Sequence, residues 1–153
     1  MHALELKVPP VALLLAAALA MWLAPSAGPD FRLPPVARTA VAPALIAVGA
    51  CLSLAGVASF LRARTTVNPT KPGSASSLVT TGVYRFTRNP MYLGLVLMLL
   101  GWAAFLSNAL AFAVVPLFVL YMNRFQIVPE ERALSALFGA EFDAYATRVR
   151  RWL

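Results

Sequence analysis

Two short polar blocks lie beside apolar runs and hold most of the side chains that could do chemistry. Residues 80–94 contain two arginines, two tyrosines, an asparagine and a proline directly before an apolar run. Residues 129–148 begin with the paired acids Glu130 and Glu131, and Arg124 lies just upstream at the end of another apolar run. Because each block adjoins the end of a hydrophobic segment, we expect the two to meet in space and form a ligand site at one membrane face.

These residue types favour a zwitterionic ligand with a cationic centre, such as a sulfonium-bearing cofactor. A carboxylate can bind an amino group, an arginine or backbone amide can bind a carboxylate, and aromatic faces can pack on a base or a sulfonium. Structural explanations stay open beside this one. Arg88 and Arg124 can extend to lipid headgroups, and Glu130 and Glu131 can simply stabilise the start of a helix.

The single histidine and the single cysteine exclude several other kinds of site. His2 lies at the N-terminus and Cys51 lies inside an apolar run, so one chain offers no multi-histidine metal site and no internal disulfide. The sequence also lacks a Ser/His/Asp set and a glycine-rich phosphate loop after a strand. We therefore expect no metal centre, and most hydrolases and nucleotide-fold enzymes are excluded.

The composition is typical of an integral membrane protein. Of the 153 residues, 60% are hydrophobic and only 12% are charged, whereas about 25% of a soluble domain is charged. The net charge of +7 does not indicate nucleic-acid binding, because the basic residues flank apolar runs, where they orient the chain and contact anionic lipid. The length predicts one domain over 1–153.

Four apolar runs predict about four transmembrane helices, over residues 8–23, 40–61, 91–106 and 109–122. The first is interpreted as a span starting near Leu4 rather than as a cleaved signal peptide, because Glu5 lies in its charged start. Residues 30–39 are too polar and proline-rich to span, so they form a connection. Only Ser107 and Asn108 separate the last two runs, which predicts a tight antiparallel helical hairpin.

The second run contains a stripe of small residues. Gly49, Ser53, Gly56 and Ser59 recur every three or four residues, which places them on one face of a helix. Small side chains let two membrane helices approach closely. We therefore expect a packing seam here rather than a ligand site.

The distribution of lysine and arginine predicts the orientation. With four crossings, the N-terminus, the 62–89 loop and the C-terminal tail share one side with 11 of the 13 basic residues, and only Arg32 and Arg38 lie on the other. The positive-inside rule places both termini and both polar blocks in the cytoplasm, at a bacterial inner membrane.

The C-terminal part predicts a helical cap. Pro129 suits the start of a short helix that Gly139 ends, and a second short helix follows over 140–149. The basic and aromatic residues 148–152 are interpreted as a lipid-interface anchor. The expected fold is an all-α integral membrane helical bundle with a short C-terminal cytosolic cap.

The two polar blocks resemble the isoprenylcysteine carboxyl methyltransferase family, which belongs with the membrane phospholipid methyltransferases. The resemblance covers residues 80–153, about half of the chain. Members are all-helical membrane enzymes that use S-adenosylmethionine and methylate lipid-like or lipidated substrates. The resemblance rests on the order of these motifs: Gly82-Val83-Tyr84-Arg85, Arg88-Asn89-Pro90-Met91-Tyr92-Leu93-Gly94, Pro129-Glu130-Glu131, Leu134, Phe138-Gly139, Tyr145 and Arg148.

The resemblance also implies roles for individual residues. The family's Arg-His-Pro-x-Tyr motif begins at Arg88, and Asn89 replaces the common histidine with a side chain that hydrogen-bonds but does not titrate. The catalytic residues it implies are Glu131 and Arg124, the latter standing for the arginine that orients a substrate carboxylate in eukaryotic members. The cofactor-binding residues it implies are Gly82, Tyr84, Arg88, Asn89, Pro90, Tyr92, Glu130, Leu134 and Phe138.

We therefore expect an S-adenosylmethionine-dependent methyltransferase whose residues 80–153 form the cofactor-binding and catalytic half. Its partners would be membrane lipid and a lipid-like or prenylated substrate, and the expected acceptor is the carboxylate of a prenylcysteine-type compound. Two alternatives stay open. One is methylation of an amine on a phospholipid or another small lipid, and the other is a non-catalytic membrane protein that uses the same helices for assembly or lipid binding.

Overall fold

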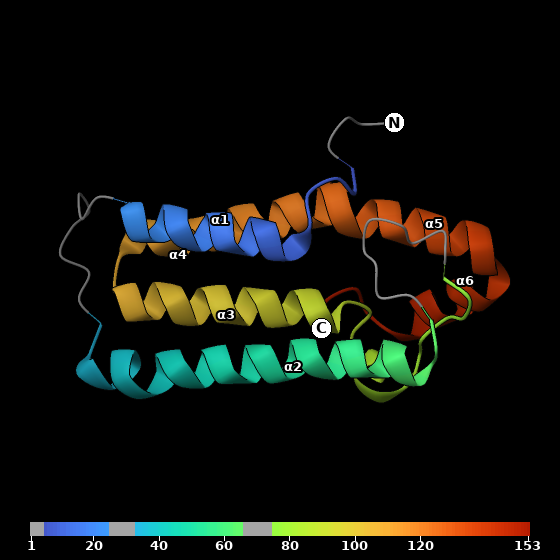
Figure 1. The fold of residues 1–153 in the computed structure, drawn as a ribbon, viewed down its shortest axis with the longest axis horizontal. Helices are drawn as coiled ribbons and strands as arrows, with labels where there is room; N and C mark the ends of the chain where they lie inside the picture. Colours follow the sequence, from blue (N-terminus) through green and yellow to red (C-terminus); the bar gives the residue numbers. More distant parts are fainter. Residues whose placement is uncertain (1–4, 25–32, 66–74) are drawn as a thin grey trace.

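The computed structural model describes residues 5–24, 33–65 and 75–153, and in these ranges the regular elements are all helical. Four long helices lie side by side and alternate in direction, and α3 packs against the other three (Figure 1). The four helices are α1 (Pro10–Leu23), α2 (Ala42–Arg62), α3 (Pro90–Leu106) and α4 (Ala109–Met122).

Two of the helices are long and apolar enough to cross a bilayer. One has 26 residues and consists of α2 with the π-helix η1 (Ala37–Val41) before it, and the other has 30 residues, Ala109–Phe138. α1 and α3 have 14 and 17 residues, about 21 and 26 Å of helix, against about 30 Å of hydrocarbon. The all-helical fold is confirmed for the described residues, and two of the four predicted spans have a helix of sufficient length, whereas crossing by α1 and α3 stays a prediction.

Two helices begin elsewhere than predicted. α1 starts at Pro10 and not near Leu4, which lies outside the described residues. Leu6 has a left-handed φ of 58°, and Pro9 is extended (ψ 135°) because a residue before a proline avoids helical angles. The second span starts at Ala37, so the end of the expected 30–39 connection is helical.

The predicted small-residue seam is confirmed between α2 and α3. A Cβ added to Gly49 would lie 2.5 Å from the Gly94 carbonyl oxygen. A Cβ added to Gly56 would lie equally close to the Met91 side chain. The Ser53 hydroxyl donates a hydrogen bond of 3.0 Å to the Met91 carbonyl oxygen. The two backbones are therefore in contact, and this contact fixes how the start of α3 stands against α2.

The fourth apolar helix continues where the sequence predicted a new helix at Pro129. α4 passes through the π-helix η4 (Asn123–Ile127) into α5 (Val128–Phe138). A proline cannot donate to the carbonyl four residues back, here that of Phe125. In the wider π-turn the Val128 amide reaches back five residues to Asn123, and the Phe125 carbonyl instead accepts from the Leu6 amide at 3.0 Å. The predicted helix start at Pro129 is confirmed to within one residue as the start of α5, but there is no break before it, because a π-turn accommodates the proline and keeps α4 and α5 continuous.

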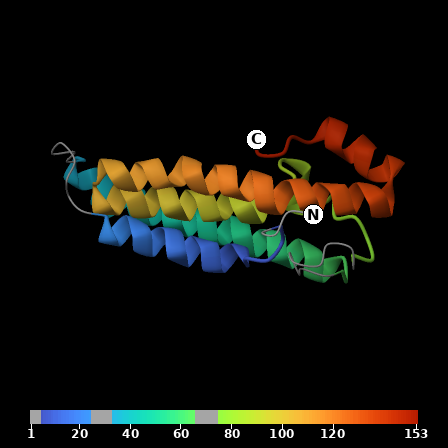
Figure 2. The same ribbon diagram turned by 90° about the horizontal axis from the view of Figure 1, so that it is seen from above.

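The predicted cap is present beyond this helix. Gly139, with a φ of 48°, ends α5 as expected, and α6 (Ala140–Arg148) follows. Figure 2 shows α6 turning back over α5 and the C-terminal tail running back along the bundle. A short 3₁₀ turn, η3 (Gly82–Arg85), precedes α3 at the same end of the molecule (Figure 1). Both polar blocks therefore meet at one end of the bundle.

The seam gives a test of the packing. We expect Gly94→Val to lower the free energy of unfolding by about 1–3 kcal/mol, because the new side chain would overlap the Gly49 carbonyl and Ser53. Ala47→Val makes a similar change on an exposed position of α2 and should have little effect. Denaturant titration of the purified protein in detergent measures both, and equal stability of the two variants would contradict the close approach.

Candidate functional site

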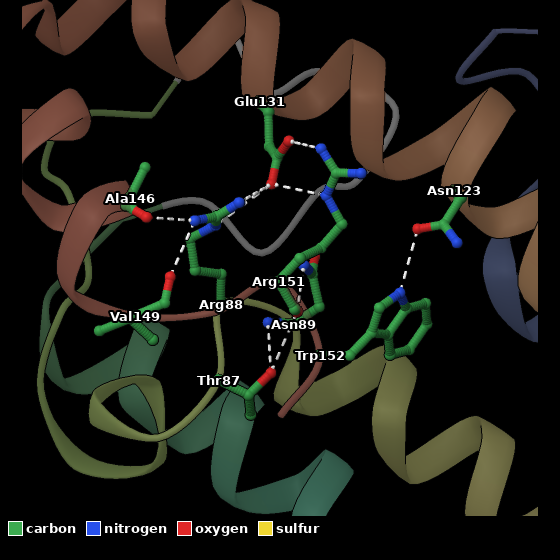
Figure 3. Close-up of polar contacts among 9 residues, drawn as sticks. All are labelled: Thr87, Arg88, Asn89, Asn123, Glu131, Ala146, Val149, Arg151 and Trp152. Atoms are coloured by element: carbon green, nitrogen blue, oxygen red, sulfur yellow. Dashed lines mark hydrogen bonds and ion pairs between the residues drawn. The ribbon is translucent and has the colours of Figure 1, made fainter.

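The turn before α3 holds the C-terminal tail. The Arg88 amide donates to the Arg150 carbonyl oxygen at 2.9 Å, and the Asn89 side-chain amide donates to the Arg151 carbonyl oxygen at 2.9 Å (Figure 3). The Thr87 hydroxyl donates to the same Arg151 oxygen at 3.2 Å and accepts from the backbone amide of Asn89. Asn89 thus binds backbone through its side chain, a function that does not require a titrating group.

Glu131 joins this turn and the tail by a double ion pair. One carboxylate oxygen accepts from Arg88 at 2.8 Å, and the other accepts from Arg151 at 2.5 Å (Figure 3). The Arg88 Nη1 group donates further to the Ala146 and Val149 carbonyl oxygens, at 2.7 and 2.8 Å. Arg88 and Glu131 expose only 14% and 18% of their side chains, so both are committed to contacts within the protein.

Glu130 lies next to this cluster but is bound differently. One of its carboxyl oxygens accepts a hydrogen bond from the Tyr92 hydroxyl. For the other oxygen no donor is found in the described part of the chain, and that oxygen is not sealed from solvent. Tyr84 and Tyr92 are both 5% exposed, and both lie close enough to Glu130 to interact electrostatically with its carboxyl group.

The pKa values of the two acids move in opposite directions. Burial raises the pKa of the Glu130 carboxyl group to about 8, with the Tyr92 hydrogen bond acting against the rise. Burial would also raise the pKa of Glu131, but the bonds from Arg151 and Arg88 outweigh it and hold that pKa below its usual value. Glu131 is therefore a fixed anion, whereas Glu130 is an acid whose ionised form would gain from a cationic partner.

Tyr145 ties α6 to the turn at η3. Its hydroxyl donates to the Tyr84 carbonyl oxygen at 2.7 Å, and burial raises its pKa to about 12. The ring of Tyr84 packs edge-on against Phe60 of α2, with 5.4 Å between centroids. Gly82 begins this turn with a φ of 63°, which glycine adopts without strain. The turn therefore connects α2, α3 and α6.

Arg124 lies apart from the two acids. Its guanidinium forms an ion pair of 3.0 Å with Glu5, which also pairs with Arg132 at 3.1 Å. Arg124 exposes 43% of its side chain, whereas Glu5 exposes 12%. The N-terminal segment thus occupies the arginine that the sequence assigned to a substrate carboxylate.

Gln126, one turn before Glu130 on the same helix, is a fully buried amide. Its Nε2 group donates to the Val8 carbonyl oxygen at 2.6 Å. Its Oε1 atom is the one buried side-chain polar atom without a partner among residues 5–24, 33–65 and 75–153. Together with the Leu6–Phe125 bond, this contact docks the start of α1 on the π-turn.

The structure brings most of the predicted site residues together. Tyr84, Arg88, Asn89, Pro90 and Tyr92 lie around the turn that faces Glu130 and Glu131, whereas Leu134 and Phe138 follow on α5 as half-buried side chains. Only Arg124 stands elsewhere, and the assigned roles stay predictions.

Sequence reasoning missed part of this end of the molecule. It read residues 148–152 as a lipid anchor, but Arg151 binds Glu131, and Trp152 packs on the core and donates to the Asn123 side-chain oxygen at 3.1 Å. The missed contacts with Glu5 and Gln126 join segments more than 100 residues apart. Neither these contacts nor those of Arg151 and Trp152 could be predicted, because the local sequence around each residue carries no signal for a partner distant in the chain.

The double ion pair predicts a pH-dependent stability. We expect Glu131→Gln to lower the free energy of unfolding at neutral pH by about 2 kcal/mol, because Arg88 and Arg151 lose a shared anion. The pKa of Glu131 is depressed in the folded state, so its contribution is complete above the unfolded value of about 4.3 and is lost as the pH falls through the folded value. The difference between wild type and variant should therefore shrink under acid.

Denaturant titrations at pH 7 and pH 4 measure this difference. Glu141→Gln, an exposed acid on α6, is the matched control and should leave stability nearly unchanged at both pH values. A loss that is the same at both pH values would contradict the ionic origin.

Comparison with known proteins places the protein within a family. The family model described as phospholipid methyltransferase matches residues 37–141, from η1 to the start of α6. An uncharacterized protein of Haemophilus influenzae is 49% identical over 63 residues, which are 41% of this chain and all of that protein. No solved structure matches. Because the match covers well over half of the chain, including both glutamates and the turn before α3, the protein belongs to the phospholipid methyltransferase family, a group of membrane methyltransferases within the isoprenylcysteine carboxyl methyltransferase-like superfamily.

Proposed function

We propose that the protein transfers a methyl group from S-adenosylmethionine to an acceptor on a lipid-like molecule. The observation that carries this proposal is Glu130, a buried carboxyl group beside two buried tyrosines, with one oxygen for which no donor is found in the described part of the chain. An acid in such surroundings gains from a cationic partner, and the methyl donor carries both an ammonium and a sulfonium.

The side chains around Glu130 fit S-adenosylmethionine. Glu130 would hold the ammonium group, and the rings of Tyr84 and Tyr92 would pack beside the sulfonium. The backbone at Gly82 allows close approach, and Leu134 and Phe138 supply apolar surface on α5 for the adenine base. Arg88 and Asn89 would act by shaping the turn, since their polar groups already bind the end of α6 and the tail, and Pro90 would act by starting α3.

The residues of the chain would then mainly position the methyl donor and the acceptor and exclude water from them. When bound, S-adenosylmethionine supplies an activated methyl group, so a strong acid or base is not needed for its transfer to a carboxylate. Glu131, Arg88 and Arg151 keep the tail closed against the turn, which holds Glu130 and Tyr92 in place. Orientation and desolvation of this kind lower the barrier without proton transfer.

Two acceptors are consistent with the site. The carboxylate of a prenylcysteine-type compound is ionised at neutral pH, and Arg124 would orient it after exchanging Glu5 for the substrate. An amine on a phospholipid is favoured by the description of the family model and by the ion pair that already occupies Arg124. Such an amine would have to lose a proton before attack.

We place the site on the cytoplasmic side of a bacterial inner membrane, with substrate supplied laterally from lipid. Among the described residues, the site end of the bundle carries every lysine and arginine except Arg38, as the positive-inside rule requires of a cytoplasmic face (Figure 1).

Binding of the methyl donor tests the first part of the proposal. We expect wild-type protein in detergent to bind S-adenosylmethionine, and Glu130→Gln to weaken binding at least tenfold, because a charge-assisted bond is worth about 1.5–3 kcal/mol. Glu141→Gln should bind like wild type. Isothermal titration calorimetry measures the affinities, and folded wild-type protein that does not bind would refute the proposal.

Methyl transfer from labelled donor separates the two acceptors. With a prenylcysteine as acceptor, Arg124→Ala should lower kcat/KM by about 10–100-fold and leave donor affinity unchanged, because only the acceptor carboxylate contacts the arginine. With an amine lipid as acceptor, the same variant should retain its activity. A product that loses its label in base is a methyl ester, whereas a stable one is an N-methylamine. A base-stable product would exclude the carboxylate as acceptor.

A further inference from the structure

A groove lies at the end of the bundle away from Glu130. It has a volume of about 1020 Å³, at the upper end of the range for small-molecule sites. The start of α2 with η1 forms one wall and the end of α3 forms the other, at the left end of the bundle in Figure 1. Its lining residues are Leu33, Pro34, Pro35, Arg38, Thr39, Ala42, Pro43, Ile46, Trp102, Phe105 and Ser107.

The groove is apolar apart from one oriented cation. Its hydroxyl groups and its indole N–H are used within the protein, since Thr39 donates to Pro35, Ser107 to Ala104 and Trp102 to Ala18. Arg38 donates through Nε to the Phe105 carbonyl oxygen at 3.0 Å, and its guanidinium lies 5.9 Å from the Phe105 ring centroid.

These contacts hold Arg38 at the groove and leave its outer edge open. For its two terminal amino groups no acceptor is found in the described ranges. A guanidinium with two free N–H groups side by side matches the paired oxygens of a phosphate.

The position of the groove indicates a lipid ligand. It lies at the start of the candidate membrane-spanning helix Ala37–Arg62, and Val36, Val41 and Val48 on or next to this stretch expose hydrophobic side chains. Its described lining contains no acid, cysteine or histidine, and the 17 residues of α3, about 26 Å of helix, separate it from the proposed methyl-transfer site. A ligand here would be bound and not transformed.

We propose that this groove is a binding site for an anionic phospholipid of the membrane leaflet opposite the methyl-transfer site. The phosphate would bind the terminal amino groups of Arg38, and an acyl chain would lie along Ala42, Ile46 and Trp102. The proposal rests on the groove and on Arg38, and it is independent of the reaction.

Native mass spectrometry of the detergent-purified protein tests it, with phosphatidylglycerol and a diacylglycerol of the same acyl chains, which lacks the phosphate, as probes. Wild type should bind one phosphatidylglycerol at least about tenfold more tightly than the diacylglycerol. Arg38→Gln should remove this preference, because the charge-assisted bond is lost. Arg38→Lys should keep part of it, since an ammonium binds phosphate without the planar fork. Arg62→Gln removes a positive charge from the opposite end of the same helix and should leave the preference intact.

A second variant tests the groove itself, in case Arg38→Gln does not fold. Ile46→Trp places a large side chain in the apolar wall, and it should weaken binding of both lipids several-fold while Arg38 is unchanged. Equal binding of the two lipids by wild type would overturn the proposal. It would also be overturned if Arg38→Gln and Arg62→Gln had the same effect.

Discussion

The candidate site depends on one carboxylate that is shared by two arginines. Glu131 belongs to the helix that continues the fourth apolar run, Arg88 to the turn before α3, and Arg151 to the tail. Each ion would be costly in a half-buried position by itself, so the three are stable only together. Because Arg88 also binds two carbonyl oxygens near the end of α6, this cluster determines where the turn, α5 and the tail stand relative to one another.

The π-turn has a comparable effect on the other side of the helix. It lets the helix pass Pro129 without a break, and it leaves the Phe125 carbonyl free to bind the amide of Leu6. The extra residue in the turn also sets which way the following side chains face, so that Glu130 meets Tyr92 while Glu131 meets the arginines. Two neighbouring acids of the same type thereby acquire different surroundings and different pKa values.

Much of the architecture could be predicted because it follows from local patterns. The apolar runs predicted the α3 and α4 helices nearly to the residue, and the spacing of Gly49, Ser53 and Gly56 predicted the seam. The motifs predicted which residues gather at the site. The start of α1 and the break before Pro129 were predicted wrongly, because proline restricts the backbone in ways that a neighbouring segment can relieve.

The sequence by itself determined a helical membrane protein with a methyltransferase-type polar end, since composition, helical spacing and motif order are all local properties of the chain. Only the tertiary structure decided the task of each polar group. Glu131 and Arg88 bind the tail, Arg124 pairs with Glu5, and Glu130 accepts from Tyr92 and has one oxygen without a donor among the described residues. Such choices depend on which partner lies within about 3 Å of a side chain, and partners distant in sequence leave no local pattern from which they could be predicted.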